Sequence, residues 1–325
     1  MNKKNMFSLA SVSFSALFAY SHLVEKRSLS SFMIENIFKM NKFFSKNSLT
    51  DDFVNHELKK SIQDNKKSIP LPKKYVSSKS YDFYYNDMQV ISWNDNNDSK
   101  QKVVFYIHGG GYVASPLSFH FKAVDKIAKN TNAKVIFPIY PKVPNSTYKD
   151  VFPKILGLYK QVLSEVDASN QVTLMGDSAG GGLALGLSLL LKEENISQPN
   201  NIILLSPWLD ISNKNIKINE IKKYDPTLSL PELEVYADLW SDNDYENQLV
   251  SPILGDPNNL GKISIFSGTH EIFYPDILDY HKKLLSEKIQ HNFFLEPRMN
   301  HVYVLFPIPE GHKAIKDIIK IISEK

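Results

Sequence analysis

The second half of the chain holds, in order, a serine, a carboxylate and a histidine that could carry out acyl transfer. Ser178 lies in the stretch 176–180, GDSAG, which follows the apolar run 171–175 and begins the long apolar stretch 179–194. That order predicts a strand, a tight turn and a helix, a geometry that exposes a serine hydroxyl at the edge of a sheet. A serine hydroxyl reacts well only when a neighbouring base takes its proton. We therefore expect a base and an acid at the ends of later strands.

His301 is the preferred base among the histidines after Ser178. It is expected in a loop just after the strand 291–296, which is where the base follows the serine and the acid in this chain order. The other four are His270, His281, His291 and His312. His281 falls in an expected helix, and His312 lies in or near the C-terminal one. His291 begins the strand 291–296, and His270 has a position that suits the acid.

Glu271 is the preferred acid because it follows the strand 262–267 closely. Asp276 and Asp210 remain alternatives. Asp276 suits the first turn of a helix over 275–289, where the helix dipole stabilises a carboxylate. Asp210 is expected to accept hydrogen bonds from loop backbone.

A glycine-rich loop, HGGG at 108–111, follows the apolar strand 102–107. Attack of a serine on an acyl carbon creates a negative oxygen, which backbone N–H groups stabilise. We expect the donors to be the N–H groups of Gly109, Gly110 and Ala179, since a glycine has no Cβ to block the approach. His108, at the strand end, is expected to hold this loop rather than to transfer a proton.

Apolar runs alternate with helical patterns over most of the chain. Strands are expected at 102–107, 133–140, 171–175, 201–206, 262–267 and 291–296, and helices at 119–130, 150–166, 179–194, 275–289 and 310–324. Continuous apolar strands between helices predict an α/β fold with a parallel sheet covered on both faces. A β-hairpin at 79–93 precedes them. The polar interval 211–250 is expected to lie over the C-terminal edge of the sheet, where ligands bind in such folds.

The N-terminal segment 6–24 has no Asp, Glu, Lys or Arg and follows two lysines. That pattern fits a secretory signal, a membrane anchor of about 20 residues or a surface helix. The chain is therefore expected to be anchored or secreted, with a cytoplasmic location as the alternative. We divide it into this segment (1–24), a helical region (25–74) and a main domain (75–325).

Composition excludes several classes of function. The net charge is +3, with 38 basic and 35 acidic residues intermingled, so no nucleic-acid surface is indicated. There is no cysteine, which excludes disulfides and thiolate chemistry. No metal-binding motif or phosphate loop occurs, and no cofactor is expected.

The motifs HGGGYV, GDSAGGGLA, LSPWLD and MNHVY resemble those of the hormone-sensitive-lipase-like branch of the α/β-hydrolases, over about residues 75–325. The resemblance implies the α/β-hydrolase fold with an eight-stranded, mostly parallel sheet, and a cap made by the N-terminal helices and the 211–250 insertion. It also implies cofactor-free hydrolysis of short or medium acyl esters. Two departures occur: GTHEIFYPD replaces the family's usual acid motif, and Val302 replaces the frequent glycine after the histidine.

The sequence thus predicts a serine carboxylesterase with a small acyl ester as substrate. An amidase or deacetylase with the same triad, and a non-catalytic binding protein of the same fold, remain the alternatives. The oligomeric state is left open, and membrane association is expected only through residues 6–24.

Overall fold

The computed structural model describes residues 15–45 and 51–324. Its strands are β1 (Ser80–Tyr85), β2 (Met88–Trp93), β3 (Val103–Ile107), β4 (Lys134–Ile139), β5 (Val172–Asp177), β6 (Asn201–Leu205), β7 (Lys262–His270) and β8 (Asn292–Asn300). Its helices are α2 (Leu29–Ser45), α3 (Asp51–Asp64), α4 (Ser118–Thr131), α5 (Tyr148–Glu165), α6 (Ala179–Glu193), α7 (Ile218–Ile221), α8 (Leu230–Ser241), α9 (Tyr274–Ser286) and α10 (Pro309–Ser323).

The strands form one eight-stranded sheet in the order β1-β2-β4-β3-β5-β6-β7-β8. The hairpin of β1 and β2 is antiparallel and joins β4 in antiparallel register, whereas the strands from β4 to β8 are parallel to one another. This is the α/β-hydrolase sheet expected from the sequence. Every residue of β3, β5 and β6 is buried, as continuous apolar strands in a sheet covered on both faces should be.

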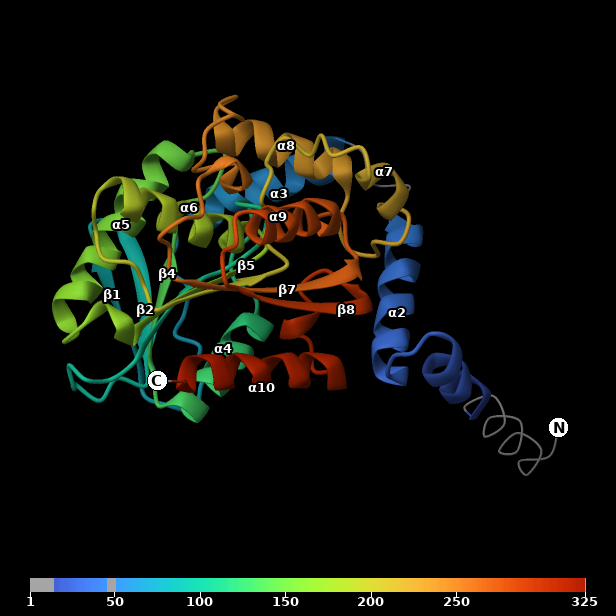
Figure 1. Ribbon diagram of the computed structural model, residues 1–325. Coiled ribbons are helices and arrows are strands. Elements are labelled where there is room, and N and C mark those ends of the chain that lie inside the picture. The colour runs from blue at the N-terminus through green and yellow to red at the C-terminus, as the bar shows by residue number, and fades with distance from the viewer. Residues whose placement is uncertain (1–14, 46–50, 325) are drawn as a thin grey trace.

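Helices cover both faces of the sheet (Figure 1). On one face, α4 and α10 pack against each other and on the sheet. On the other, α5, α6 and α9 form the larger core with the inward side chains of the central strands. Burial of these apolar side chains is the main stabilising contribution, at about 25 cal/mol per Å² removed from water.

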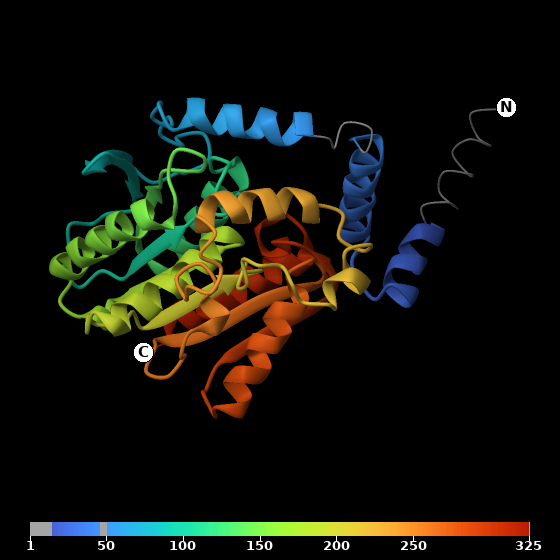
Figure 2. The ribbon, with the colours of Figure 1, turned by 90° about the horizontal axis from the view of Figure 1, so that it is seen from above.

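Two segments lie over the C-terminal edge of the strands (Figure 2). One is α3, from the region before the sheet, and the other is α8, from the 211–250 interval. The two helices line the same pocket. Asp225, in the loop before α8, accepts a hydrogen bond at 2.8 Å from the backbone N–H of Ile272, so this loop is fastened to a strand end of the main domain.

The strands β7 and β8 are longer than expected. β8 continues to Asn300 instead of ending near residue 296, because it stays paired with β7 as far as the His270–Asn300 pair, across a register shift after Gly268. A side chain at Gly268 would place its Cβ 2.0 Å from the Met299 carbonyl oxygen. The glycine therefore permits the close approach that extends both strands, and His301 is the first residue after β8.

The described part of the N-terminal segment, residues 15–24, is helical and lies on the outer side of α2 (Figures 1 and 2). Residues 6–14 of the expected signal or anchor lie outside the described residues. Among the helices that are described, none has the length and apolar character needed to cross a membrane.

The crossing of β5 and α6 depends on glycines. A Cβ on Gly176 would lie 2.2 Å from the Gly180 carbonyl oxygen, and one on Gly180 would lie 2.1 Å from the Ile107 carbonyl oxygen. We expect Gly180→Ala to lower the free energy of unfolding by about 1–3 kcal/mol, since the backbone of β3 must move to admit the methyl group. Urea unfolding followed by circular dichroism measures this. An unchanged midpoint would contradict the close packing described here.

Candidate active site

Ser178 occupies the turn between β5 and α6. Its backbone has φ 53° and ψ −124°, a conformation that side-chain-bearing residues rarely adopt and that is characteristic of a nucleophile on a strained turn. The Ser178 N–H donates to the Leu205 carbonyl oxygen at 2.9 Å, which ties the turn to the end of β6. The turn projects the hydroxyl away from the sheet, at the N-terminus of α6, where partial positive charge favours an anion.

His301 lies within hydrogen-bond distance of the Ser178 hydroxyl. Its Nε2 is 2.9 Å from Ser178 Oγ, and its Nδ1 is 2.7 Å from Glu271 Oε2. Edge-on packing against Phe273, with ring centroids 5.2 Å apart, fixes the plane of the imidazole. With Nδ1–H donated to the carboxylate, Nε2 is left as the acceptor that faces the serine.

Glu271 is fully buried and held by several donors. Its Oε1 accepts hydrogen bonds from Ser267 Oγ at 2.7 Å, from the Gly268 N–H at 2.9 Å and from Ser206 Oγ at 3.0 Å. Its other oxygen faces His301. A buried carboxylate that accepts this many hydrogen bonds is held in one orientation. The structure therefore brings together the serine, histidine and glutamate that the sequence singled out.

The two alternative acids are not in contact with the histidine. Asp276, in the first turn of α9, accepts a hydrogen bond from Asn215 at 2.8 Å. Asp210 accepts one from the backbone N–H of Ser212 at 2.8 Å, as expected for loop backbone. Within the described residues, no hydrogen bond joins either carboxylate to His301.

The glycine-rich loop differs from expectation at Gly109. Its N–H donates to Asp177 Oδ1 at 2.9 Å, so this group, one of the three expected oxyanion donors, is already used. Gly110 and Gly111 take positive φ values of 118° and 60°, and both line the pocket beside Ser178. Among the described residues, no acceptor binds the N–H groups of Gly110, Gly111 or Ala179. The donors available for an oxyanion are therefore these three.

Asp177 organises the loop, a function that the sequence analysis missed. Besides the Gly109 N–H, it accepts a hydrogen bond from Tyr106 Oη at 2.7 Å, and its Oδ2 lies 3.3 Å from His120 Nε2. Burial tends to raise the pKa of Asp177, but the His120 charge and the hydrogen bonds from His120, Tyr106 and Gly109 lower it overall. The sequence feature that could have revealed this function is the position of Asp177 directly before the serine. A carboxylate at that position points away from the serine hydroxyl and back toward the end of β3.

His108 has the structural position that the sequence predicted. Its Nδ1 bonds the Gly109 carbonyl oxygen at 2.7 Å, and its ring stacks on Tyr140 at 4.5 Å. Tyr140 Oη also donates to the His108 carbonyl oxygen at 2.9 Å. Complete burial lowers the pKa of His108 to about 3. The ring is therefore neutral, and it makes no hydrogen bond to Ser178.

Ser178 and His301 open into a pocket of about 260 Å³. It is lined by the glycine-rich loop and the segment after it, by α8 and the loop before it, and by Phe53 and Glu57 of α3. The apolar lining residues are Phe53, Val113, Ala114, Leu117, Phe119, Leu228, Leu233, Tyr236 and Val302. Glu57, Asp177 and Glu232 add three carboxylates. A partly apolar cleft with convergent polar groups is typical of a small-molecule site.

Comparisons with known proteins agree with this geometry. Residues 104–305 match the family model described as the alpha/beta hydrolase fold. A curated esterase of Acinetobacter venetianus is 28% identical over 224 residues, which cover 68% of this chain and 74% of the relative. The crystal structure of a Staphylococcus aureus protein assigned as an esterase is 32% identical, covers 85% of this chain and 94% of its own, and has a TM-score of 0.80. An esterase from the bacterial hormone-sensitive lipase family, at 20% identity, shares the fold, with a TM-score of 0.76 over 91% of this chain and 98% of its own.

The alternative acid Asp276 generates a prediction about pH. Burial raises its pKa from 3.8 to about 7, and nearby Asp210 and Asp279 add to the rise. The folded state therefore holds a proton that the unfolded state releases near pH 4, so stability falls as pH rises toward 7. Asp276→Asn removes this dependence. The free energy of unfolding of the variant minus that of the wild type should increase by about 2–3 kcal/mol between about pH 5 and pH 8.

Urea unfolding at each pH provides the measurement, and Asp279→Asn provides the control. The pKa of Asp279 is lowered overall, by hydrogen bonds from Lys282, Asn215 and Lys217 that outweigh the effect of burial. Asp279 therefore contributes no such pH dependence of its own, and its replacement should give only a small part of the increase, because it removes one of the charges that raise the pKa of Asp276. Parallel pH profiles for wild type and Asp276→Asn would show that Asp276 is not buried as described.

Proposed function

The chain belongs to the α/β-hydrolase family whose model matches residues 104–305, and from this premise we propose a mechanism. Like its esterase relatives, it is an ester hydrolase. We assign the chemistry to Ser178, His301 and Glu271, and the substrate to short- and medium-chain acyl esters. The observation that carries this assignment is the continuous line of hydrogen bonds from Glu271 through His301 to Ser178, which ends in an open pocket.

In the first half of the reaction, Ser178 Oγ attacks the acyl carbon while His301 Nε2 takes the hydroxyl proton. The carbonyl oxygen becomes negative in the tetrahedral intermediate. The N–H groups of Gly110, Gly111 and Ala179 are the donors for this oxygen, and losing one such donor typically costs about 3 kcal/mol of transition-state stabilisation. The intermediate collapses as His301 gives its proton to the leaving alcohol, which leaves the acyl group on Ser178.

In the second half, a water molecule takes the place of the alcohol. His301 removes a proton from the water as its oxygen attacks the acyl carbon, and the same N–H groups hold the new oxyanion. The bond to Ser178 Oγ then breaks, the serine regains its proton from His301, and the carboxylic acid is released. No metal or cofactor takes part in this scheme.

Glu271 contributes by holding the imidazole. Its carboxylate keeps the proton on Nδ1, so that Nε2 faces the serine, and it stabilises the positive charge that His301 acquires. Ser206 links this acid to the base: its Oγ donates to Glu271 and accepts a hydrogen bond at 3.0 Å from the Val302 N–H. The residue after the histidine is thereby tied to the acid as well.

The pocket supports small acyl esters as substrates. Its volume of about 260 Å³ and its apolar lining from α8 and the loop after Gly111 suit a short hydrocarbon chain. The side chain of Tyr236 packs on Gly111, where an added Cβ would lie 3.2 Å from Tyr236 Cδ2. This contact places α8 directly against the oxyanion loop and restricts the space for a long chain.

Ser178→Ala should abolish ester hydrolysis while the fold is kept. We expect kcat to fall by at least about 10⁴-fold, because removal of the nucleophile leaves only binding and oxyanion stabilisation. Hydrolysis of p-nitrophenyl butyrate measures this. Ser188→Ala is the control, since Ser188 is buried in α6 and its hydroxyl bonds only the Ala184 carbonyl oxygen. Wild-type turnover by Ser178→Ala would refute the mechanism.

The identity of the acid can be tested with three variants. Glu271→Gln keeps the size of the side chain but cannot hold the Nδ1 proton, and the equivalent change in a serine protease lowers kcat by about 10⁴-fold. Asp276→Asn and Asp210→Asn should keep kcat near that of the wild type. Melting temperatures report whether each variant folds. If a folded Glu271→Gln stays active while one of the others loses activity, the acid has been misassigned.

A further inference from the structure

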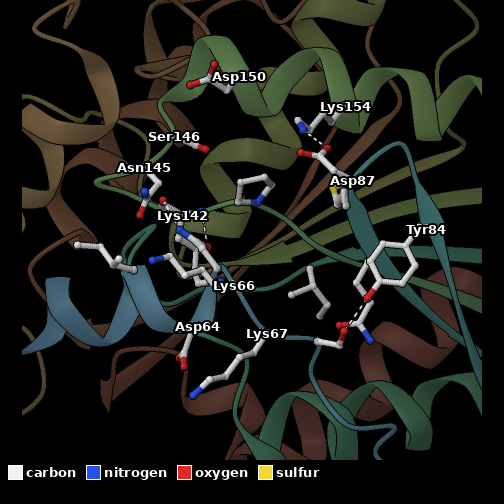
Figure 3. Close-up of a pocket in the computed structure, with 17 residues that line it drawn as sticks. Asp64, Lys66, Lys67, Tyr84, Asp87, Lys142, Asn145, Ser146, Asp150 and Lys154 are labelled. Atoms are coloured by element: carbon white, nitrogen blue, oxygen red, sulfur yellow. Dashed lines mark hydrogen bonds and ion pairs between the residues drawn. The ribbon is translucent and has the colours of Figure 1, made fainter.

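A second cavity, of about 570 Å³, lies apart from the proposed catalytic residues (Figure 3). It is open to solvent and is lined by the C-terminal end of α3 and the residues after it, the β1–β2 hairpin, the segment 139–146 after β4 and the first turns of α5. None of the residues assigned to ester hydrolysis lines it. Its most unusual component is Lys142, which lies two residues before Pro144 in the segment that follows β4.

Lys142 is 1% exposed, yet its ammonium group has no partner among the described residues. The backbone of this lysine is fixed. Its N–H donates to Asn65 Oδ1 at 3.1 Å, and its carbonyl oxygen accepts from Asn65 Nδ2 at 2.8 Å. The neighbouring Val143 carbonyl oxygen accepts from Ser61 Oγ. Hydrogen bonds to Ser61 in α3 and to Asn65, the first residue after α3, thus hold the backbone of Lys142 in the wall of the cavity.

An unpaired ammonium in this position is costly. Burial disfavours the charged form of a lysine and lowers the pKa of Lys142 to about 8, although the charge of Asp64 acts in the opposite direction. A methionine would fill the same space without that penalty. An anion in the cavity would offset the cost, because it would supply the missing counter-charge.

Other groups around the cavity favour an anion with several oxygen atoms. Lys66 and Lys67 line it, and no described residue pairs with their ammonium groups. Asn145 and Ser146 also line it, and their side chains have no hydrogen-bond partner in the described chain. In Figure 3, Lys66, Lys142 and Asn145 lie on one side and the Asp87–Lys154 ion pair on the other.

The carboxylates of the cavity are already engaged. Asp87 pairs with Lys154. Asp150 accepts hydrogen bonds from the backbone N–H and the hydroxyl of Thr147, at 2.8 and 3.3 Å. Asp64 accepts one from Ser115 Oγ at 3.0 Å. Only Asp87 is neutralised by a cation; Asp64 and Asp150 keep their charge, and the lining carries four lysines against three aspartates.

We propose that this cavity binds a small phosphorylated molecule, with its phosphate on Lys142 and Lys66, whose side chains lie together in Figure 3. A phosphate monoester carries close to two negative charges at neutral pH and has three acceptor oxygens, which matches two neighbouring ammonium groups better than the single charge of a carboxylate does. The volume exceeds what a phosphate group needs, so the remaining space takes an organic part, for which Asn145 and Ser146 are hydrogen-bonding groups. The site is independent of ester hydrolysis.

Calorimetric titration of the full chain at constant ionic strength tests this, with glycerol 3-phosphate as the probe. We expect saturable binding, with no heat from glycerol or acetate. Lys142→Met should weaken binding at least about tenfold, and it should melt no lower than the wild type because an unpaired buried charge is removed. Lys160→Met, on the exposed face of α5, is the matched control and should bind as the wild type does.

Inorganic phosphate is titrated in parallel. Binding equal to that of glycerol 3-phosphate would support the phosphate site and assign the cavity to the free ion. Lys66→Gln should also weaken binding, since it removes a second ammonium from the same wall. The proposal is overturned if no saturable binding occurs below about 5 mM, or if folded Lys142→Met binds as tightly as the wild type.

Discussion

The left-handed backbone of Ser178 is the constraint on which the rest of this site depends. To hold a serine in that conformation, β5 must pass directly into α6, and the two can approach only because Gly176 and Gly180 have no side chains. The same turn sends the preceding residue, Asp177, back toward β3, where it binds the Gly109 N–H. One strained turn thus sets the position of the hydroxyl and, through Asp177, that of the glycine-rich loop opposite.

The second half of the site is built by the extended pairing of β7 and β8. Their long parallel register places Glu271 and His301 each immediately after a strand, side by side at the edge of the sheet. The loop before α8 is attached at the same place, because Asp225 accepts a hydrogen bond from the residue after Glu271. The segment that covers the pocket is therefore anchored next to the acid, which couples the cap to the hydrogen-bonded line beneath it.

Much of this arrangement could be predicted from the sequence because it is encoded locally. The alternation of apolar runs and helices predicted the sheet, and strand ends identified Ser178, Glu271 and His301 as residues that would meet. The use of the Gly109 N–H by Asp177 could not be predicted, since it joins groups 68 residues apart in the chain. The continuation of β8 to Asn300 was missed for a similar reason: it depends on a close approach between Gly268 and Met299. The burial of Lys142 likewise arises from packing against α3, a contact that no local pattern reveals.

The central claim is that Ser178 carries the acyl group during turnover. The most direct measurement is to treat the protein with diethyl p-nitrophenyl phosphate, which transfers its phosphoryl group to an activated serine, and to locate the modification by peptide mass spectrometry. The account predicts release of one equivalent of p-nitrophenol per chain, loss of esterase activity in parallel, and a diethylphosphoryl group on Ser178. Modification at another residue with the same loss of activity, or full activity in a chain modified at Ser178, would contradict it.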